Sequence, residues 1–304
     1  MYVEKRNDNS HVKYYLVHSY RAGGVVKKIR RYLGKDLSDK ELSKRRIEVE
    51  KVIFGLLDDL NTEVFLFSLS PNQVKSLNSY SDQIDVVHFD KSDWLNFKES
   101  FVFNTNAIEG SHVKEEDVKL ILDKKRVSSL DEIEIKGVAL AVEFIKSTKE
   151  DLSVDFIRKL HKLCFDGSKS FAGQFRSVEV VIRNSEGVIV HEGVPVRTLG
   201  FALNDLVEWY HENRSKFKPL VLAAIIHNQF EYIHPFQDGN GRVGRLLLNF
   251  ILFKNNYPPI NILLKDRFEY YRTLQAYDSN QDLKPTLKFL VKQYDKTIRQ
   301  VTTR

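Results

Sequence analysis

Residues 234–245 read HPFQDGNGRVGR, and they follow LVLAAIIHNQFEYI (220–233), in which apolar residues recur at helical spacing. We expect a buried helix that ends at His234, because the residue before a proline avoids the helical region. A glycine-containing loop comes next, and RVGRLLLNFILF (242–253) begins a second apolar helix. The stretch therefore predicts two apolar helices joined by a short glycine loop.

Helical spacing of apolar residues continues through most of the chain after about residue 90. One stretch departs from it, because VEVVIRNSEGVIV (178–190) places two β-branched runs around a turn signature and predicts a β-hairpin. The sequence thus predicts a mainly α fold, a helical bundle with one small hairpin. The expected helices are 91–108, 114–123, 130–148, 153–165, 198–213, 218–233, 241–254, 266–278 and 284–300.

The N-terminal part of the chain differs from the rest in its strand-like pattern and its basic charge. Residues 12–33 carry two runs rich in Val, Tyr and Ile around Gly23-Gly24, which predicts a β-hairpin. Ser38 and Glu41 have the spacing of a capping box, so a helix should run from there to about residue 60. Residues 1–51 contain 14 Lys/Arg and 7 Asp/Glu. We expect a basic hairpin-and-helix extension over 1–60 and a main domain over 61–304.

Composition narrows the class of protein. Hydrophobic residues make up 42% and charged residues 29% of the 304 positions, which is typical of globular proteins. No apolar run approaches the roughly 18–20 residues of a membrane span. The N-terminus has no apolar segment of the kind found in signal peptides. Cys164 is the single cysteine, so the chain forms no internal disulfide. These features predict a cytoplasmic protein without membrane contact.

The quoted loop gathers groups that suit phosphate chemistry. A glycine loop that enters a helix N-terminus binds anions through free N–H groups and the helix dipole. Arg242 and Arg245 lie on one face of the first turn and suit a polyphosphate. Asp238 makes sense as a ligand of a divalent cation that also binds phosphate oxygens. His234 can accept a proton near pH 7. The sequence lacks the P-loop pattern GxxxxGK[ST], and the arginines oppose a zinc site at His234 and Asp238.

These residues closely resemble the Fic family, whose signature is HPFx[DE]GNGRxxR. Nine defined positions match within twelve residues. Further segments resemble the family in the expected order, so the resemblance covers about residues 90–300. It implies a helical bundle with a small β-hairpin. The segments are LDEIEIKGVALAVEFI (130–145), FIRKLHKLCF (156–165), AGQFRSVEVVI (172–182) and FEYYRTLQA (268–276).

The resemblance implies transfer of AMP from ATP to a hydroxyl side chain of a target protein, which could be the chain itself, with release of pyrophosphate. His234 would deprotonate the incoming Tyr, Ser or Thr hydroxyl, and Asp238 would hold Mg²⁺ on the α- and β-phosphates. Backbone N–H groups of 239–241, with Asn240, would take the charge that develops at the α-phosphate. Arg242 would contact the phosphates, and Arg245 would grip the γ-phosphate.

The resemblance also assigns the rest of the pocket. The hairpin would hold the target chain by strand addition. Asp278 stands where many relatives have Asn, which leaves its nucleotide contact open. The residues implied in nucleotide binding are Asp238, Gly239, Asn240, Gly241, Arg242, Val243, Gly244, Arg245, Tyr270, Tyr271 and Asp278, and those implied in the target flap are Val180, Val181, Ile182 and Arg183.

A second motif precedes the first. Residues 105–110 read TNAIEG, and Thr105, Glu109 and Gly110 fit the pattern [ST]xxxE[GN] that many Fic proteins carry on an inhibitory helix. A carboxylate at Glu109 would form a charge-assisted pair with Arg245 and occupy the group that should hold the γ-phosphate. The resemblance is to the subgroup with an N-terminal inhibitory helix in the same chain, here about residues 91–109.

Two alternatives stay open at this stage. Some relatives use the inhibitory glutamate to remove AMP, so the chain could be a de-AMPylase. It could also be a regulatory or nucleic-acid-binding protein in which residues 1–60 act and the Fic domain is held inactive. We favour a simpler interpretation of residues 1–60, a solvated strand face that packs on the main domain. The target protein and the oligomeric state, including a homodimer, are left open.

Overall fold

The chain folds into two compact units, Met1–Val74 and Lys75–Arg304. The sequence had placed the division after residue 60, and the separate roles predicted for the two parts stay a prediction. No helix in the described part of the chain is long and apolar enough to cross a membrane. The computed structural model describes residues 1–8, 11–22, 25–60, 63–64, 67–183 and 186–302.

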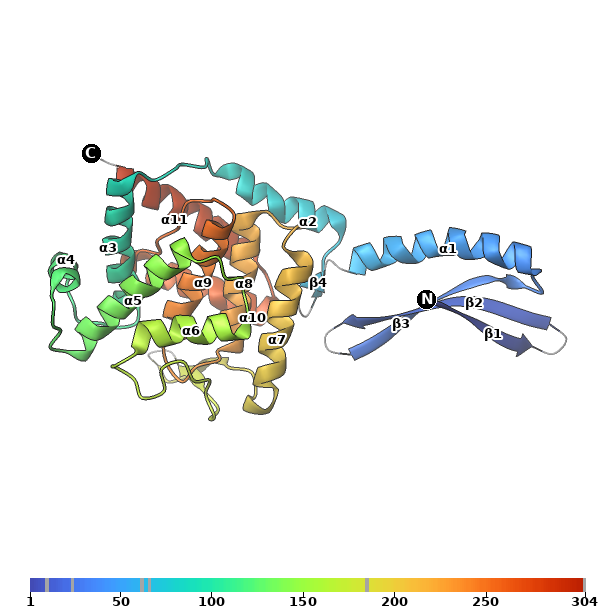
Figure 1. The fold of residues 1–304 in the computed structure, drawn as a ribbon, viewed down its shortest axis with the longest axis horizontal. Helices are drawn as coiled ribbons and strands as arrows, with labels where there is room; N and C mark the ends of the chain where they lie inside the picture. The colour runs from blue at the N-terminus through green and yellow to red at the C-terminus, as the bar shows by residue number, and fades with distance from the viewer. Residues whose placement is uncertain (9–10, 23–24, 61–62, 65–66, 184–185, 303–304) are drawn as a thin grey trace. The chain divides into compact units, whose positions relative to one another are not determined.

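The N-terminal unit is an antiparallel sheet with a helix. The expected hairpin is present as β2 (His11–Ala22) and β3 (Val25–Lys35), with its turn at 23–24 outside the described residues. The sequence did not predict β1 (Tyr2–Asp8), which pairs with β2 and makes the order β1-β2-β3. The helix α1 (Asp39–Leu60) begins at the predicted cap (Figure 1).

The cap of α1 has the expected reciprocal geometry. The Ser38 N–H donates to Glu41 Oε2 at 3.0 Å, and the Glu41 N–H donates to Ser38 Oγ at 3.4 Å. A small core forms between the sheet and α1. A two-stranded sheet, β4 (Glu63–Val64) and β5 (Phe67–Ser68), and the helix α2 (Pro71–Asn78) were not predicted. The buried members of the core are Leu16, Ile29, Leu33 and Ile53.

The C-terminal unit is the predicted helical bundle, and it confirms a mainly α fold. Serine caps begin two of its helices, because Ser129 and Ser153 accept hydrogen bonds from the third helical residue. Each predicted helix is present within a few residues of its expected bounds. The helices are α3 (Lys91–Ile108), α4 (Glu115–Asp123), α5 (Leu130–Ser147), α6 (Val154–Phe165), α7 (Val196–Asn213), α8 (Pro219–Ile233), α9 (Asn240–Lys254), α10 (Arg267–Asn280) and α11 (Lys284–Thr302), with short 3₁₀ helices at Ser79–Gln83 and Leu264–Asp266.

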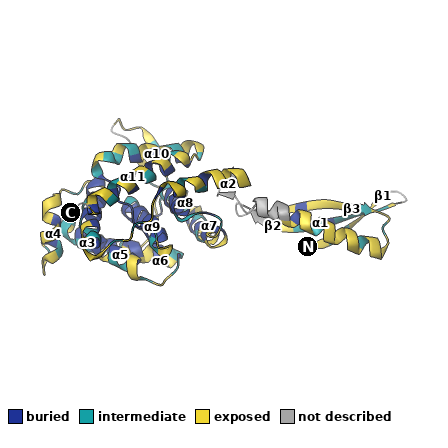
Figure 2. Cartoon of the chain, turned by 90° about the horizontal axis from the view of Figure 1, so that it is seen from above, coloured by how far each residue is buried: buried dark blue, intermediate teal, exposed yellow. Residues whose placement is uncertain are grey.

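The helices α8 and α9 form the centre of this unit. The colouring by burial shows them largely buried, with other helices around them (Figure 2). From Leu220 to Phe230 every residue of α8 is buried, including three polar ones. The loop 234–239 that joins α8 to α9 is therefore held at both ends by the most buried elements of the unit.

The predicted hairpin is confirmed as β6 (Val181–Arg183) and β7 (Ile189–Glu192), an antiparallel pair. Residues 184–185 of its turn lie outside the described residues. Its base is joined to the end of α8, because the Val194 N–H donates to the Ile233 carbonyl at 3.3 Å. The hairpin is thereby placed beside the loop that carries His234.

Candidate active site

The loop between α8 and α9 has a backbone that the sequence explains locally. His234 ends α8 in the left-handed region, with φ 52°, as the C-cap of the helix. Gly239 has φ 86°, and a Cβ there would lie 2.3 Å from the Phe165 ring. Glycine is required at this position both for its conformation and for the close approach to α6.

The Asn240 side chain closes the loop. Its Oδ1 accepts from the Phe236 N–H at 2.8 Å, and its Nδ2 donates to the Phe236 carbonyl at 2.9 Å. The side chain is 2% exposed and is thus committed to holding the loop. What the first turn of α9 offers to an anion is its backbone N–H groups, which have no partner within the helix.

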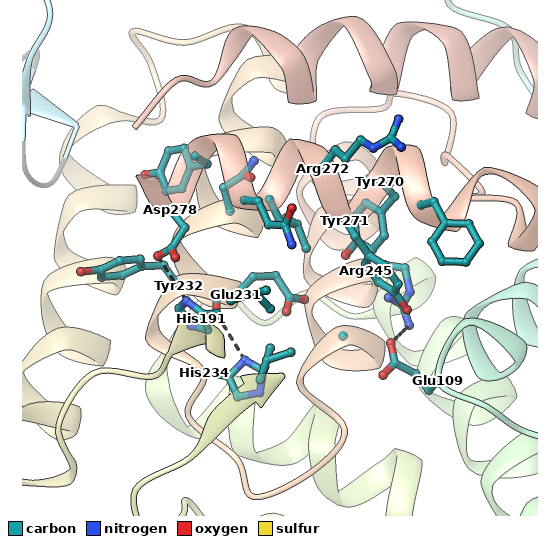
Figure 3. A pocket seen from close by; sticks show the side chains of 18 of the residues that line it. Glu109, His191, Glu231, Tyr232, His234, Arg245, Tyr270, Tyr271, Arg272 and Asp278 are labelled. Atoms are coloured by element: carbon teal, nitrogen blue, oxygen red, sulfur yellow. Dashed lines mark hydrogen bonds and ion pairs between the residues drawn. The ribbon is translucent and has the colours of Figure 1, made fainter. Parts of the chain in front are cut away.

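His234 has the properties of a neutral base. Its Nδ1 lies 3.3 Å from the Glu231 carbonyl (Figure 3). Because a carbonyl only accepts, Nδ1 carries the proton and Nε2 keeps its lone pair. Burial, reinforced by the nearby His191, lowers the pKa of His234 to about 4. The imidazole is therefore unprotonated at neutral pH and able to take a proton.

His234 lines a cavity of about 770 Å³. Glu109 from the end of α3, Arg245 from α9 and Ile182 from β6 also lie on its wall. Tyr270, Tyr271 and Asp278 line the side formed by α10, as Figure 3 shows. The structure thus brings the predicted base, the predicted inhibitory glutamate and the predicted aromatic pair to one cavity.

Arg245 is buried and shared between two partners from α3. Its Nη2 donates to Glu109 Oε1 at 2.7 Å and to the Thr105 carbonyl at 2.9 Å. Its Nε donates to Thr105 Oγ1 at 2.7 Å. The residue is 2% exposed, so these charge-assisted bonds form away from bulk water. The pairing of Glu109 with Arg245, which the sequence predicted, is present in the structure.

Local features bring Glu109 to this position. Gly110 follows it with φ 91°, a conformation typical of a helix end. The Tyr271 hydroxyl donates to the Ile108 carbonyl at 3.1 Å and connects α10 to the same helix end. A Cβ on Gly241 would lie 2.2 Å from Glu109 Oε1. The glycine of α9 therefore makes room for the carboxylate.

The carboxylate of Asp238 points to basic partners. Lys169 Nζ lies 2.8 Å from Oδ2, and Arg242 Nη2 lies 3.8 Å from Oδ1. Burial tends to raise the pKa of Asp238, but these cations outweigh it, so the pKa is lowered. The side chain is ionised at neutral pH and is half-exposed.

Residues 151–252 match the model of the Fic/DOC family. The chain carries a Fic/DOC family domain. It is 29% identical over 207 residues to Protein adenylyltransferase Fic of Nematostella vectensis, with 65% of this chain and 47% of that protein covered. It is 30% identical over 211 residues to Protein adenylyltransferase fic-1 of Caenorhabditis briggsae, with 66% of this chain and 40% of that protein covered. The chain thus spans less than half the length of these curated relatives.

Solved structures agree on the fold of the Fic domain. A Fic domain-containing signaling protein from Bacteroides thetaiotaomicron aligns with a TM-score of 0.61 at 25% identity, over 75% of this chain and 96% of that one. A Fic family protein from Desulfovibrio desulfuricans aligns with a TM-score of 0.63 at 25% identity, over 77% of this chain and 75% of that one. The alignments cover three quarters of the chain, beyond the residues that the family model matches.

Several predicted site residues of the Fic domain are turned away from the cavity. Arg242 forms an ion pair with Glu134, stacks 4.4 Å over the Phe165 ring and is not among the residues that line the cavity. The side chain of Val243 is fully buried in the core. Gly244 faces Glu231, whose Oε1 would lie 2.1 Å from a Cβ at that position. Direct nucleotide contacts by Arg242 and Val243 stay predictions.

On the hairpin side, two predicted residues line the cavity. Ile182 and Arg183 of β6 belong to its wall, and Val181 lies next to them on the same strand. Val180 precedes the strand and accepts from the Gly193 N–H at 3.2 Å. Asp278 is paired with His191 of β7, whose Nδ1 lies 3.2 Å from Oδ1. Asp278 on α10 is thus joined to the hairpin strand β7.

Sequence reasoning missed two buried residues that position the loop. Arg176 donates from Nε to the His234 carbonyl at 2.7 Å and from Nη2 to the Val194 carbonyl. His161 accepts from the Gly173 N–H at 2.8 Å, so its other ring nitrogen donates to the Asp238 carbonyl at 3.0 Å. The only available signal was that each of these polar residues lies in a segment with many apolar residues. Their hydrogen-bond partners come from other elements, so the sequence did not predict their roles.

It also missed Glu231 and His191 on the cavity wall. Glu231 lies in the last turn of α8, and its Oε1 is buried with no hydrogen-bond partner among the described residues. Burial raises the pKa of Glu231 to about 8, although Arg245 acts in the opposite direction. The carboxyl group is thus mostly protonated at neutral pH, and Figure 3 shows it between His234 and Arg245.

Proposed function

We propose that this chain is an autoinhibited protein adenylyltransferase that moves AMP from ATP to a Tyr, Ser or Thr hydroxyl of a target protein and releases pyrophosphate. The observation that carries the proposal is the 2.7 Å contact of Arg245 Nη2 with Glu109 Oε1 on the wall of the cavity that His234 lines. The names of the relatives, protein adenylyltransferases, support the reaction class.

In this mechanism His234 acts as the general base. Its Nε2 takes the proton of the attacking hydroxyl, and the Glu231 carbonyl and Arg176 hold the ring and the backbone in place. The N-terminus of α9 stabilises the charge that develops on the α-phosphate through its backbone N–H groups. Arg245 binds the γ-phosphate after Glu109 has left it, and this aligns the α-phosphate with the hydroxyl.

Magnesium is part of the proposal, and the residues present fit it. No group of three or more His, Cys, Asp or Glu in the described residues could hold a metal alone. Mg²⁺ is commonly bound by one or two carboxylates together with substrate phosphates. Asp238 is an ionised carboxylate beside the α9 N-terminus, so it would hold the ion once Lys169 moves away. The bound ion would neutralise charge on the phosphates.

Autoinhibition follows from competition for one guanidinium. A γ-phosphate and the Glu109 carboxylate compete for the same guanidinium of Arg245, and the carboxylate is already attached to its own helix. When Arg245 is occupied, bound ATP lacks the contact to its γ-phosphate that would align the α-phosphate with the attacking hydroxyl. The helix α3, which carries Thr105 and Glu109, is proposed to be the inhibitory helix.

Incubation of the purified chain with ATP labelled at the α-phosphate tests this proposal. Removal of one charge-assisted hydrogen bond of about 1.5–3 kcal/mol corresponds to about a 10- to 100-fold change. We therefore expect Glu109→Gly to raise self-labelling or labelling of proteins in a lysate roughly tenfold or more, and His234→Ala to remain unlabelled. The double variant is the control and should also remain unlabelled. Equal labelling of the wild type and Glu109→Gly would reject the inhibitory role.

Removal of AMP is the second candidate activity. Glu109 lines the same cavity as His234, and its side chain is 27% exposed, which leaves access for water. The same assay includes an arm with a target that was labelled beforehand by Glu109→Gly. Loss of this label with the wild type and not with Glu109→Gly would favour removal as the main activity.

A further inference from the structure

The sheet of the N-terminal unit has two unlike faces. On one face Leu16 of β2 and Ile29 of β3 pack against Ile53 of α1. On the other face, the described residues of this unit place no helix. Because side chains alternate along a strand, the residues next in sequence to the core residues point to this second face.

The register of the strands defines the second face. Tyr15 pairs with Glu4 on one side and with Tyr32 on the other, and Val17 pairs with Tyr2 and Arg30. We call this surface the tyrosine face. Its members are Tyr2, Glu4, Arg6, Lys13, Tyr15, Lys28, Arg30 and Tyr32, and Val17, which shares the face, is fully buried.

Aromatic rings lie on all three strands of the tyrosine face. The ring centroids of Tyr15 and Tyr32 are 5.4 Å apart, and the Arg6 guanidinium lies 5.5 Å from the Tyr15 ring. Tyr2 is 48% and Tyr32 is 52% exposed, far more than tyrosines of a packed surface. Exposed rings beside cations form the kind of surface on which unpaired bases stack.

The charge of the tyrosine face is positive. Among the named members of the face, the basic residues Arg6, Lys13, Lys28 and Arg30 outnumber the acid Glu4. Arg6 Nε lies 2.6 Å and Arg30 Nη2 lies 3.0 Å from this carboxylate, so it holds two guanidinium groups on the face. Contact with Arg6 and Arg30 also keeps the pKa of Glu4 below its usual value. The face is therefore complementary to a chain of phosphates.

We propose that the tyrosine face binds single-stranded nucleic acid. Bases stack on Tyr2 and Tyr32, and phosphates contact the basic residues between them. A duplex offers phosphates but keeps its bases stacked inside, so it would leave the exposed rings unused. An anionic membrane would use the charges, and its interface also accepts tyrosine rings, so vesicles enter the test as a competing partner. This inference is independent of the proposed transferase, because it rests on residues 2–35 only.

The test measures binding of the full chain to fluorescein-labelled oligo(dT) and oligo(rU) by fluorescence anisotropy at several salt concentrations. Both strands are used because a sheet that stacks bases can accept DNA or RNA, and their relative affinity shows which one it prefers. We expect micromolar binding to at least one of them. The logarithm of the binding constant should fall with the logarithm of salt by about 0.7 per phosphate contacted.

Variants separate stacking from charge. Tyr32→Ala should weaken binding roughly tenfold or more, since base–aromatic stacking contributes about 1–3 kcal/mol per base. Tyr32→Phe keeps the ring and should bind like the wild type. Lys28→Ala should reduce the salt slope, while Lys44→Ala removes the same charge from an exposed position of α1 and should leave the slope unchanged.

Four outcomes would overturn the proposal. They are no binding of either strand, equal affinity for a duplex of the same length, equal binding by Tyr32→Ala and the wild type, and binding to phosphatidylserine vesicles that depends on Tyr32 in the same way. The position of Tyr32 outside the core lets the variant fold, and circular dichroism verifies this.

Discussion

Arg245 is held by a hydroxyl and a carboxylate that lie one helical turn apart on α3. Thr105 takes Nε and Glu109 takes Nη2, so the two residues position the planar guanidinium from the same helix. The motif predicted that Glu109 would reach Arg245, because the pairing joins opposite charges. The hydrogen bond from Nε to Thr105 could not be predicted, since it depends on how α3 and α9 approach each other.

Replacement of Thr105 by valine tests the contribution of this hydroxyl. Thr105→Val preserves the shape of the side chain but leaves Arg245 Nε without an acceptor in a buried place, which costs about 1–3 kcal/mol. We expect self-labelling to rise severalfold, less than in Glu109→Gly, because Glu109 still competes for Nη2. Thr105→Ser keeps the hydroxyl and is the matched control. Labelling of the valine variant at the level of the serine variant would show that Thr105 does not support the pair.

At the scale of elements, α5 and α6 approach so closely that only glycine fits between them. A Cβ on Gly137 of α5 would lie 2.3 Å from the Cys164 carbonyl of α6. Gly200 of α7 offers the opposite environment, since no described atom outside its chain neighbours and its own helix backbone lies within 4 Å of the same position there. The two glycines have equal helix propensities, so a comparison of them isolates the packing of α5 on α6.

We expect Gly137→Ala to destabilise the chain by about 3 kcal/mol, because the helices must separate. Gly200→Ala should stabilise it by about 0.5–1 kcal/mol, since alanine favours the helix more than glycine does. Urea denaturation followed by circular dichroism gives both free energies of unfolding. Equal stability of the two variants would mean that α6 adjusts to a side chain at residue 137.

Some elements of the fold were predictable from the sequence and others were not. The long helices were predictable because their apolar spacing and serine caps are local signals. The strand β1 was not, because Tyr2–Asp8 is rich in charged residues and is stabilised by pairing with β2. In the site, the loop and the Glu109–Arg245 pair were predictable from motifs. The inward turn of Arg242 was not, because Glu134 and Phe165 come from other helices.

At the scale of the whole molecule, the buried titratable groups of α8 and its C-cap connect stability to pH. Burial lowers the pKa values of His227 and His234 to about 4, so both are neutral in the folded chain. They contribute stability that is lost as pH falls from about 6.5 toward 4. The contribution of Glu231 to stability has the opposite pH dependence. Because its pKa is raised in the folded chain, it favours the folded state at low pH, and this contribution is lost as pH rises toward 8.

The pH dependence of Glu231→Gln tests this assignment. Glutamine resembles the protonated carboxyl group but does not ionise. We expect the variant to gain stability over the wild type as pH rises from about 4.5 to 8, by at most about 1.4 kcal/mol per pH unit. Urea unfolding at pH 5, 6.5 and 8 measures the difference, with the exposed Glu115→Gln as control. A difference that stays constant across these pH values would contradict the assignment.

The pair between Glu109 and Arg245 joins two parts of the chain that are 136 residues apart. Docking of the α3 end and occupation of Arg245 by an outside anion are thus linked equilibria with one coupling free energy. An anion that binds the guanidinium lowers the equilibrium constant for docking of the α3 end by a certain factor. Undocking of the α3 end raises the affinity for that anion by the same factor. The end of α3 therefore competes with the anion for Arg245, and the fraction of molecules in which it is undocked rises with the anion concentration.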